Sequence, residues 1–184
     1  MSKIKNTILV VLLTSFVICQ KTYIQAGRLI DGITEIPIEM VTIVINGKTI
    51  QSILRGHVQP GPKDSLISLK EFTVLPGLMD MHTHLSGQSS PKSYMEKFYM
   101  DLDEYAYRSI PYAEKTLMAG FTTVRNLGDS DNVTISLRNA INAGIVSGPR
   151  IYSAGKSIAT TGGHADRTNG VREDIFQSPS PSDG

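Results

Sequence analysis

Alternating apolar and polar positions predict a small β unit near the start of the chain. The segments with this pattern, rich in β-branched side chains, are residues 22–30, 41–45, 48–54 and 66–69. Asn46-Gly47 stands between the second and third segments, and apolar strands flanking Asn-Gly predict a hairpin with a type I′ turn. We expect these strands to form part of an antiparallel sheet.

From Phe72 onward, segments with helical periodicity alternate with segments that have the strand pattern. The segments expected in order are an apolar strand over 78–85, helical spacing over 91–120 with a break at Pro111, a strand over 121–125, a helix ending at Gly144 and a strand over 149–153. Strands that alternate with helices imply parallel βαβ units with right-handed crossovers. The sequence therefore predicts an α/β fold.

Polar side chains follow each strand of this second part. His82 and His84 end the first strand, residues 125–129 follow the second, and residues 160–166 follow the third. Because ligand-binding groups of α/β proteins lie at the carboxyl ends of strands, we expect a functional site there.

The N-terminus has the build of a signal peptide. Lys3 and Lys5 precede an apolar run over residues 8–18, which is too short to cross roughly 30 Å of hydrocarbon as a stable anchor. We expect residues 1–19 to be removed and the mature chain to start near Gln20, in the periplasm or outside the cell. A lipid-modified Cys19 and a buried core helix are the competing interpretations.

The amino-acid composition limits which macromolecular partners and which metal-binding side chains can be expected. A net charge of +1 with 19% charged residues gives no electrostatic reason to expect a nucleic acid or an anionic membrane as partner. The single cysteine is Cys19, so a mature chain starting at Gln20 would have no thiolate. A metal site there would use His and carboxylate ligands.

His82 and His84 are the strongest candidate ligands. Side chains alternate along a strand, so Asp80, His82 and His84 are expected to share one face. Two imidazoles at positions i and i+2 can converge on one divalent ion at about 2.0–2.1 Å. Two ordinary histidines remain the alternative for an isolated His-x-His.

Several segments together resemble the amidohydrolase superfamily, in the branch of imidazolonepropionase-like and Xaa-Pro-dipeptidase-like proteins. The matching motifs are VLPGLMDMHTHL at 74–85, AGRLIDG at 26–32, AGFTTVRNLG at 119–128, GPRIYSAG at 148–155 and TTGGHAD at 160–166. The resemblance implies a small β-sandwich segment over 20–71, followed over 72–184 by the first three βα units of a TIM-like (β/α)₈ barrel.

The resemblance also implies a metal-dependent hydrolase. It assigns His82 and His84 as first-strand ligands of one or two divalent ions, usually zinc. In the family the other ligands are a lysine of the fourth strand, histidines of the fifth and sixth, and an aspartate of the eighth that moves the proton. Asn126 stands where an aspartate is common in this branch.

The same resemblance places His164 at the mouth of the site, as a substrate contact with Asp166 beside it. Arg125 could pair with a substrate carboxylate, and an internal ion pair is its alternative. His164 could equally bond to nearby backbone. His57, in the β unit, is interpreted as structural. The implied substrates are small molecules, of the dipeptide or N-acyl amino acid class.

The chain length leaves two interpretations of the fold open, an open three-layer protein and a barrel that is cut short. A complete barrel needs roughly 250 residues, whereas only about 110 follow Phe72. We favour a truncated hydrolase, because residues 177–184 have Ser/Pro-rich loop composition where a fourth unit would begin. The alternatives are a non-catalytic secreted module of the same fold and, less favoured, a two-histidine metal carrier of another fold.

Overall fold

The computed structural model describes residues 20–129, 131–166, 170 and 172. The expected signal peptide over 1–19, including Cys19, lies outside the described residues. The chain divides into two compact units, with the division between Pro76 and Gly77.

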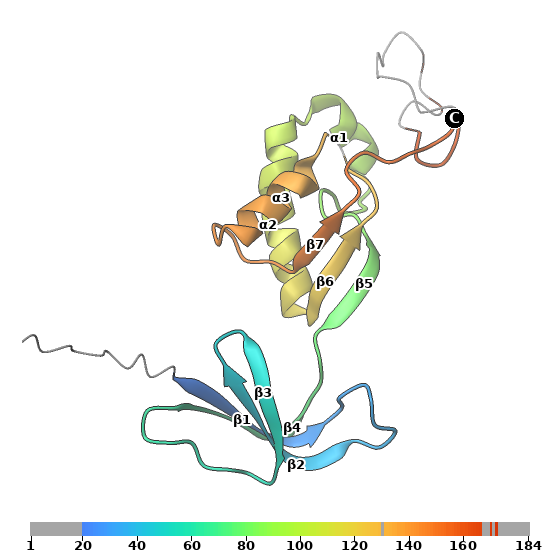
Figure 1. The fold of residues 1–184 in the computed structure, drawn as a ribbon. Coiled ribbons are helices and arrows are strands. Elements are labelled where there is room, and N and C mark those ends of the chain that lie inside the picture. The colour runs from blue at the N-terminus through green and yellow to red at the C-terminus, as the bar shows by residue number, and fades with distance from the viewer. Residues whose placement is uncertain (1–19, 130, 167–169, 171, 173–184) are drawn as a thin grey trace, which may run out of the picture. The chain divides into compact units, whose positions relative to one another are not determined.

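The first unit is a four-stranded sheet. Its strands are β1 (Lys21–Leu29), β2 (Ile38–Asn46), β3 (Thr49–Arg55) and β4 (Ser65–Val74), in the order β3-β2-β1-β4 (Figure 1). The four expected strands are confirmed, but the sheet is mixed, because β1 pairs antiparallel with β2 and parallel with β4. Buried Ala26, Leu29, Val41 and Ile43 form its core. The β-sandwich stays a prediction.

The hairpin between β2 and β3 differs from the expected turn. Asn46 still pairs with Thr49, so the two loop residues are Gly47 and Lys48. Gly47 has a φ of +60°, and neither Asn46 nor Lys48 has a positive φ. A type II′ turn requires positive φ only at its first central residue, and Gly47 occupies that place. The Asn-Gly pair therefore predicted the hairpin correctly and the turn type wrongly.

The second unit contains a parallel three-stranded sheet in the order β5-β6-β7. Its strands are β5 (Leu78–Thr83), β6 (Phe121–Asn126) and β7 (Arg150–Ser153). Three helices accompany them, α1 (Ser93–Tyr99), α2 (Leu102–Met118) and α3 (Val133–Asn142). Helices α2 and α3 lie against one face of the sheet (Figure 1). This arrangement confirms the expected α/β class, while closure into a barrel stays a proposal.

One apolar cluster holds the helices to the sheet. It joins Leu85, Ala113, Val124, Leu137 and Ile151, all less than about a tenth exposed. Val124 and Ile151 come from neighbouring strands, and Ala113 and Leu137 from the two helices. Burying these side chains fixes the sheet beneath α2 and α3, and with it the strand ends where the polar residues lie.

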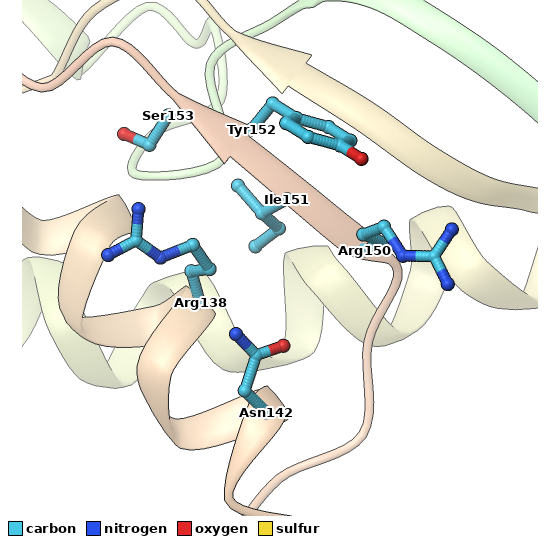
Figure 2. A pocket seen from close by; sticks show the side chains of 6 residues that line it. All are labelled: Arg138, Asn142, Arg150, Ile151, Tyr152 and Ser153. Atoms are coloured by element: carbon cyan, nitrogen blue, oxygen red, sulfur yellow. The ribbon is translucent and has the colours of Figure 1, made fainter.

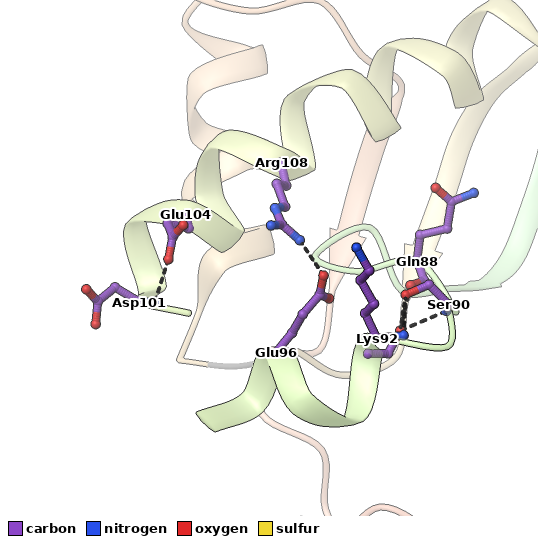
Figure 3. Close-up of polar contacts among 8 residues, drawn as sticks. Gln88, Ser90, Lys92, Glu96, Asp101, Glu104 and Arg108 are labelled. Atoms are coloured by element: carbon purple, nitrogen blue, oxygen red, sulfur yellow. Dashed lines mark hydrogen bonds and ion pairs between the residues drawn. The ribbon is translucent and has the colours of Figure 1, made fainter. Parts of the chain in front are cut away.

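The helical stretch breaks earlier than expected. Pro111 lies inside α2, which runs through it, and the chain instead leaves the helix at Met100. Proline removes the hydrogen bond to the carbonyl four residues earlier, that of Tyr107, a residue on the exposed side of the helix. At the break, Glu104 accepts a hydrogen bond from the Asp101 N–H at 3.1 Å and starts α2 (Figure 3).

An ion pair links the two helices on either side of the break. Arg108 of α2 donates to Glu96 of α1 at 2.8 Å (Figure 3). The hydrogen bond to Glu96 raises the pKa of Arg108 above its ordinary value. None of the described helices has the length and apolar character needed to cross a bilayer.

Candidate metal centre

The candidate site lies at the carboxyl ends of β5, β6 and β7, where backbone bonds continue beyond the strands. Leu127 N–H donates to the Thr83 carbonyl at 3.2 Å, and Asp129 N–H donates to the Gly155 carbonyl at 3.0 Å. The three segments that follow the strands are therefore tied side by side. This confirms that polar residues far apart in the sequence meet at one edge.

The structure brings His82 and His84 together. Their Nε2 atoms are 3.3 Å apart, and the ring centroids are separated by 5.2 Å with an interplanar angle of 64°. His82 is a residue of β5, and His84 follows its end. Both side chains are exposed, so a ligand can reach the two nitrogens. The expected convergence of the two imidazoles is confirmed.

A backbone carbonyl fixes the orientation of His84. Its Nδ1 lies 3.0 Å from the carbonyl oxygen of Gly128. Because a carbonyl can only accept, we assign the proton of the neutral ring to Nδ1. The lone pair of His84 then lies on Nε2, the atom that faces His82. Metal-binding histidines are usually held in this way through their second nitrogen.

The donor set fits a tetrahedral divalent ion. Zinc–nitrogen bonds of about 2.0–2.1 Å at a tetrahedral angle place two ligand nitrogens about 3.3–3.4 Å apart. The observed Nε2 separation is 3.3 Å. In metal-free protein the same contact is a hydrogen bond in which His82 donates to the bare Nε2 of His84. To hold an ion between the rings, His82 would carry its ring proton on Nδ1, so that both Nε2 lone pairs are free to bind.

Asp80 does not extend this pair into a three-ligand group. Its Oδ1 accepts the backbone N–H of His82 at 3.0 Å. Between Asp80 and Thr83 the pairing of β5 with β6 shifts, because Val124 and Asn126, their partners, are only two residues apart. An extra residue of this kind interrupts the regular alternation of side chains within this stretch, and the expected shared face of Asp80 with the histidines stays a prediction. Within the described ranges, no three His, Cys, Asp or Glu side chains are grouped to hold a metal.

The remaining predicted site residues lie on β6 and on the loop after β7. Arg125 is exposed, and its Nε donates to the Met81 carbonyl at 2.9 Å, so this bond reaches backbone and not a carboxylate. His164 is exposed in the loop after β7. Asp166 is 8% exposed and accepts the Gly162 N–H at 2.8 Å, within its own loop. Substrate binding by these three residues stays a prediction.

Sequence reasoning missed the groups that support His84. Asn126 is fully buried at the end of β6, and Gly128 supplies the carbonyl that His84 uses. The sequence did offer one signal. Asn126 is a polar residue two positions after Val124, which places it on the same, buried face of the strand. His57 has the structural role expected of it, because its Nε2 lies 3.1 Å from the Ala26 carbonyl.

A hollow of about 410 Å³ lies elsewhere in this unit, between α3 and β7 (Figure 2). Its lining residues are Arg138, Asn142, Arg150, Ile151, Tyr152 and Ser153. None of the predicted site residues lines it, so the hollow is separate from the histidine pair.

The chain is similar in sequence and in structure to several known proteins. A family model described as the amidohydrolase family matches residues 73–180. Ochratoxinase of Aspergillus niger is 30% identical over 153 residues, covering 79% of this chain and 30% of that protein. The structure of a Xaa-Pro dipeptidase with bound methionine is 46% identical, with a TM-score of 0.80 over 87% of this chain and 39% of that one. A prolidase complexed with N-methylphosphonate-L-proline is 30% identical, with a TM-score of 0.72 over 87% of this chain and 37% of that one.

Proposed function

Because the chain belongs to the amidohydrolase family, we propose that it supplies the first two metal ligands of a hydrolase that cleaves carbon–nitrogen bonds. The proposed ion is divalent, with zinc favoured by the two imidazole donors. The proposed substrates are dipeptides or N-acyl amino acids. The Xaa-Pro dipeptidase and the prolidase among its relatives support that class.

The observation that carries this proposal is the geometry of the histidine pair. The Nε2 atoms of His82 and His84 are 3.3 Å apart, and the Gly128 carbonyl holds the Nδ1 proton of His84. Two exposed imidazoles without a shared ligand gain little from such convergence, whereas an ion held between them uses both lone pairs. A bound ion would polarise the scissile carbonyl and lower the pKa of its bound water far enough to supply hydroxide near neutral pH.

Arg125 is the proposed contact for the substrate carboxylate. Its Nε is anchored on the Met81 carbonyl, which orients the guanidinium at the end of β6. Arginine binds carboxylates through paired N–H groups, and a dipeptide or an N-acyl amino acid carries one carboxylate at its end. His164 and Asp166 are proposed to contribute from the loop after β7.

The rest of the centre is proposed to come from polypeptide outside this sequence. The chain spans 30% of the length of ochratoxinase and 39% of the Xaa-Pro dipeptidase chain. We propose that the lysine, the further histidines and the aspartate used by the family belong to later strands of a closed TIM-like barrel. Two imidazoles alone hold an ion weakly and provide no general base, so we expect no hydrolysis from the 184-residue chain alone.

The test is hydrolysis by the protein at its natural length. Release of free amine from Xaa-Pro dipeptides and N-acyl amino acids is measured before chelation, after chelation and after zinc is restored. We expect activity to vanish with chelation, return with zinc, and fall at least about a hundredfold in His82→Ala and His84→Ala. His57→Gln is the matched control and keeps full activity.

Metal-independent hydrolysis, or unchanged rates in both ligand variants, would contradict the proposed mechanism. Absence of activity on both substrate classes, with normal metal content, would support the alternative of a non-catalytic binding module.

We also propose that the protein is exported. The supporting feature is the pair of lysines before an apolar run that ends near Cys19. Sequencing the amino terminus of protein from the native host tests this proposal. The expected start is Gln20, and an intact Met1 would contradict export with cleavage.

A further inference from the structure

A buried asparagine lies directly behind the candidate metal ligand His84. The Asn126 side chain is fully buried, and its Nδ2 donates to the carbonyl oxygen of Gly128 at 3.1 Å. The same oxygen lies 3.0 Å from Nδ1 of His84. One carbonyl thus accepts both the amide of Asn126 and the imidazole of His84.

Asn126 also holds the backbone at the residue after His84. Its Oδ1 accepts the N–H of Leu85, the residue after His84, at 2.7 Å. The asparagine therefore binds the chain next to His84 and the carbonyl to which His84 donates. Leu85 lies 41 residues before Asn126 in the sequence, and Gly128 lies two residues after it. A side chain with both a donor and an acceptor is needed for this arrangement.

The asparagine belongs to a larger buried network on its far side. Its Nδ2 also contacts Thr134 Oγ1 at 3.2 Å, and that hydroxyl lies 2.8 Å from Ser153 Oγ. Asp129 accepts hydrogen bonds from both the N–H and the hydroxyl of Thr134. The network ties the start of α3 to the ends of β6 and β7. It offers a position, Thr134, that touches Asn126 without touching His84 or Gly128.

We infer that Asn126 is a positioning residue for the metal centre, which fixes the Nδ1–H tautomer and the orientation of His84 through the Gly128 carbonyl. The inference rests on the proposed metal-binding function of His84. Its physical basis is that a carbonyl held from one side by an amide donor cannot turn away from the imidazole on the other. The bare Nε2 of His84 is thereby kept aimed at the ion.

The test compares three variants of the protein at its natural length. Asn126→Leu keeps a similar side-chain volume but removes both the donor to Gly128 and the acceptor for the Leu85 N–H. Asn126→Ala removes both functions with a smaller side chain. Thr134→Val, in the same buried network, is the matched control. Zinc affinity is measured by competition with a chromophoric chelator, and the ring tautomer of His84 by long-range ¹H–¹⁵N NMR of metal-free protein.

We expect both Asn126 variants to lower zinc affinity by about ten- to a hundredfold, as loss of a partner behind a ligand usually does. We also expect a mixture of His84 tautomers in them. Thr134→Val keeps the wild-type tautomer and an affinity close to wild type.

Three results would overturn the inference. One is an unchanged tautomer and affinity in the folded Asn126 variants. The second is an equal loss in Thr134→Val, and the third is loss of the fold in both Asn126 variants; either of these would assign Asn126 to the fold alone. A wild-type protein that binds no zinc would refute the proposed function instead, and the tautomer of metal-free His84 would still report on Asn126.

Discussion

Gly77 is a position where one added methyl group should disturb the packing of β5 against β6. A Cβ atom built on Gly77 would lie 2.6 Å from Cβ of Thr122, and 2.1 and 2.2 Å from its Oγ1 and Cγ2 atoms. Rotating Thr122 cannot relieve these contacts, because its Cβ is fixed to the backbone of β6. Gly77 lacks a positive φ, so the penalty of Gly77→Ala is steric and not conformational.

The size of the effect follows from these distances. Non-bonded carbon atoms prefer separations of about 3.5–4.0 Å, so the start of β5 must move by about 1 Å from β6. Overpacking of this kind usually costs about 1–3 kcal/mol. The displacement also strains the bond from Leu78 N–H to the Gly120 carbonyl, 2.9 Å long, for which about 1 kcal/mol is typical. We therefore expect the free energy of opening of β6 to fall by about 3 kcal/mol.

The assay is native-state hydrogen exchange of the amides in β5 and β6, which reports the local free energy of opening. Gly87→Ala is the control, because no atom lies within 4 Å of its added Cβ, and its effect should stay within about 0.5 kcal/mol. Thr122→Gly removes all three clashing atoms, so the double variant should recover about 2 kcal/mol of the loss. Equal protection in Gly77→Ala and Gly87→Ala would refute the close approach of these strands.

Three further predictions concern the frame around the site. Val124→Ala deletes two buried methyl groups between the sheet and its helices, and we expect about 2–3 kcal/mol less stability in urea unfolding; a loss below 1 kcal/mol would contradict the described core. Glu104→Ala removes the acceptor of the Asp101 N–H at the start of α2 and should cost about 1 kcal/mol, seen as faster amide exchange in the first turn of α2 only. Asp31 accepts bonds from the Thr34 N–H, the Ile33 N–H and the Thr34 hydroxyl, which lower its pKa below the ordinary 3.8. Its turn is therefore stabilised above that value and loosens as pH falls through the lowered pKa; an NMR titration midpoint at or above 3.8 would contradict this.

Most of the elements could be predicted from the sequence because apolar and β-branched side chains are concentrated where a strand is buried. Val41 and Ile43 of β2 and Val124 of β6 are buried strand residues, and the pattern around each predicted its strand. The break expected at Pro111 was wrong, because α2 continues through this residue while Ala113, two positions later, packs in the core of the unit. Such packing depends on which face of α2 meets the sheet, and periodicity alone did not settle it at this residue.

The candidate site could be predicted only in part. His82 and His84 are two residues apart, so strand geometry alone was enough to expect converging rings. The support for His84 comes from Gly128, 44 residues away, through a backbone carbonyl that carries no side-chain signature. The register shift after Asp80 was equally hidden, since it depends on how β5 pairs with β6. Contacts of this kind are set by the folded sheet and leave no local pattern.

The central claim is that His82 and His84 hold one metal ion together. The most direct test is the zinc content of the purified natural-length protein and of His82→Ala, His84→Ala and His57→Gln, measured by mass spectrometry after dialysis. The account predicts bound zinc in the wild type and in His57→Gln, and loss of at least one equivalent in each of the other two variants. Wild-type zinc content in both His82→Ala and His84→Ala would contradict it.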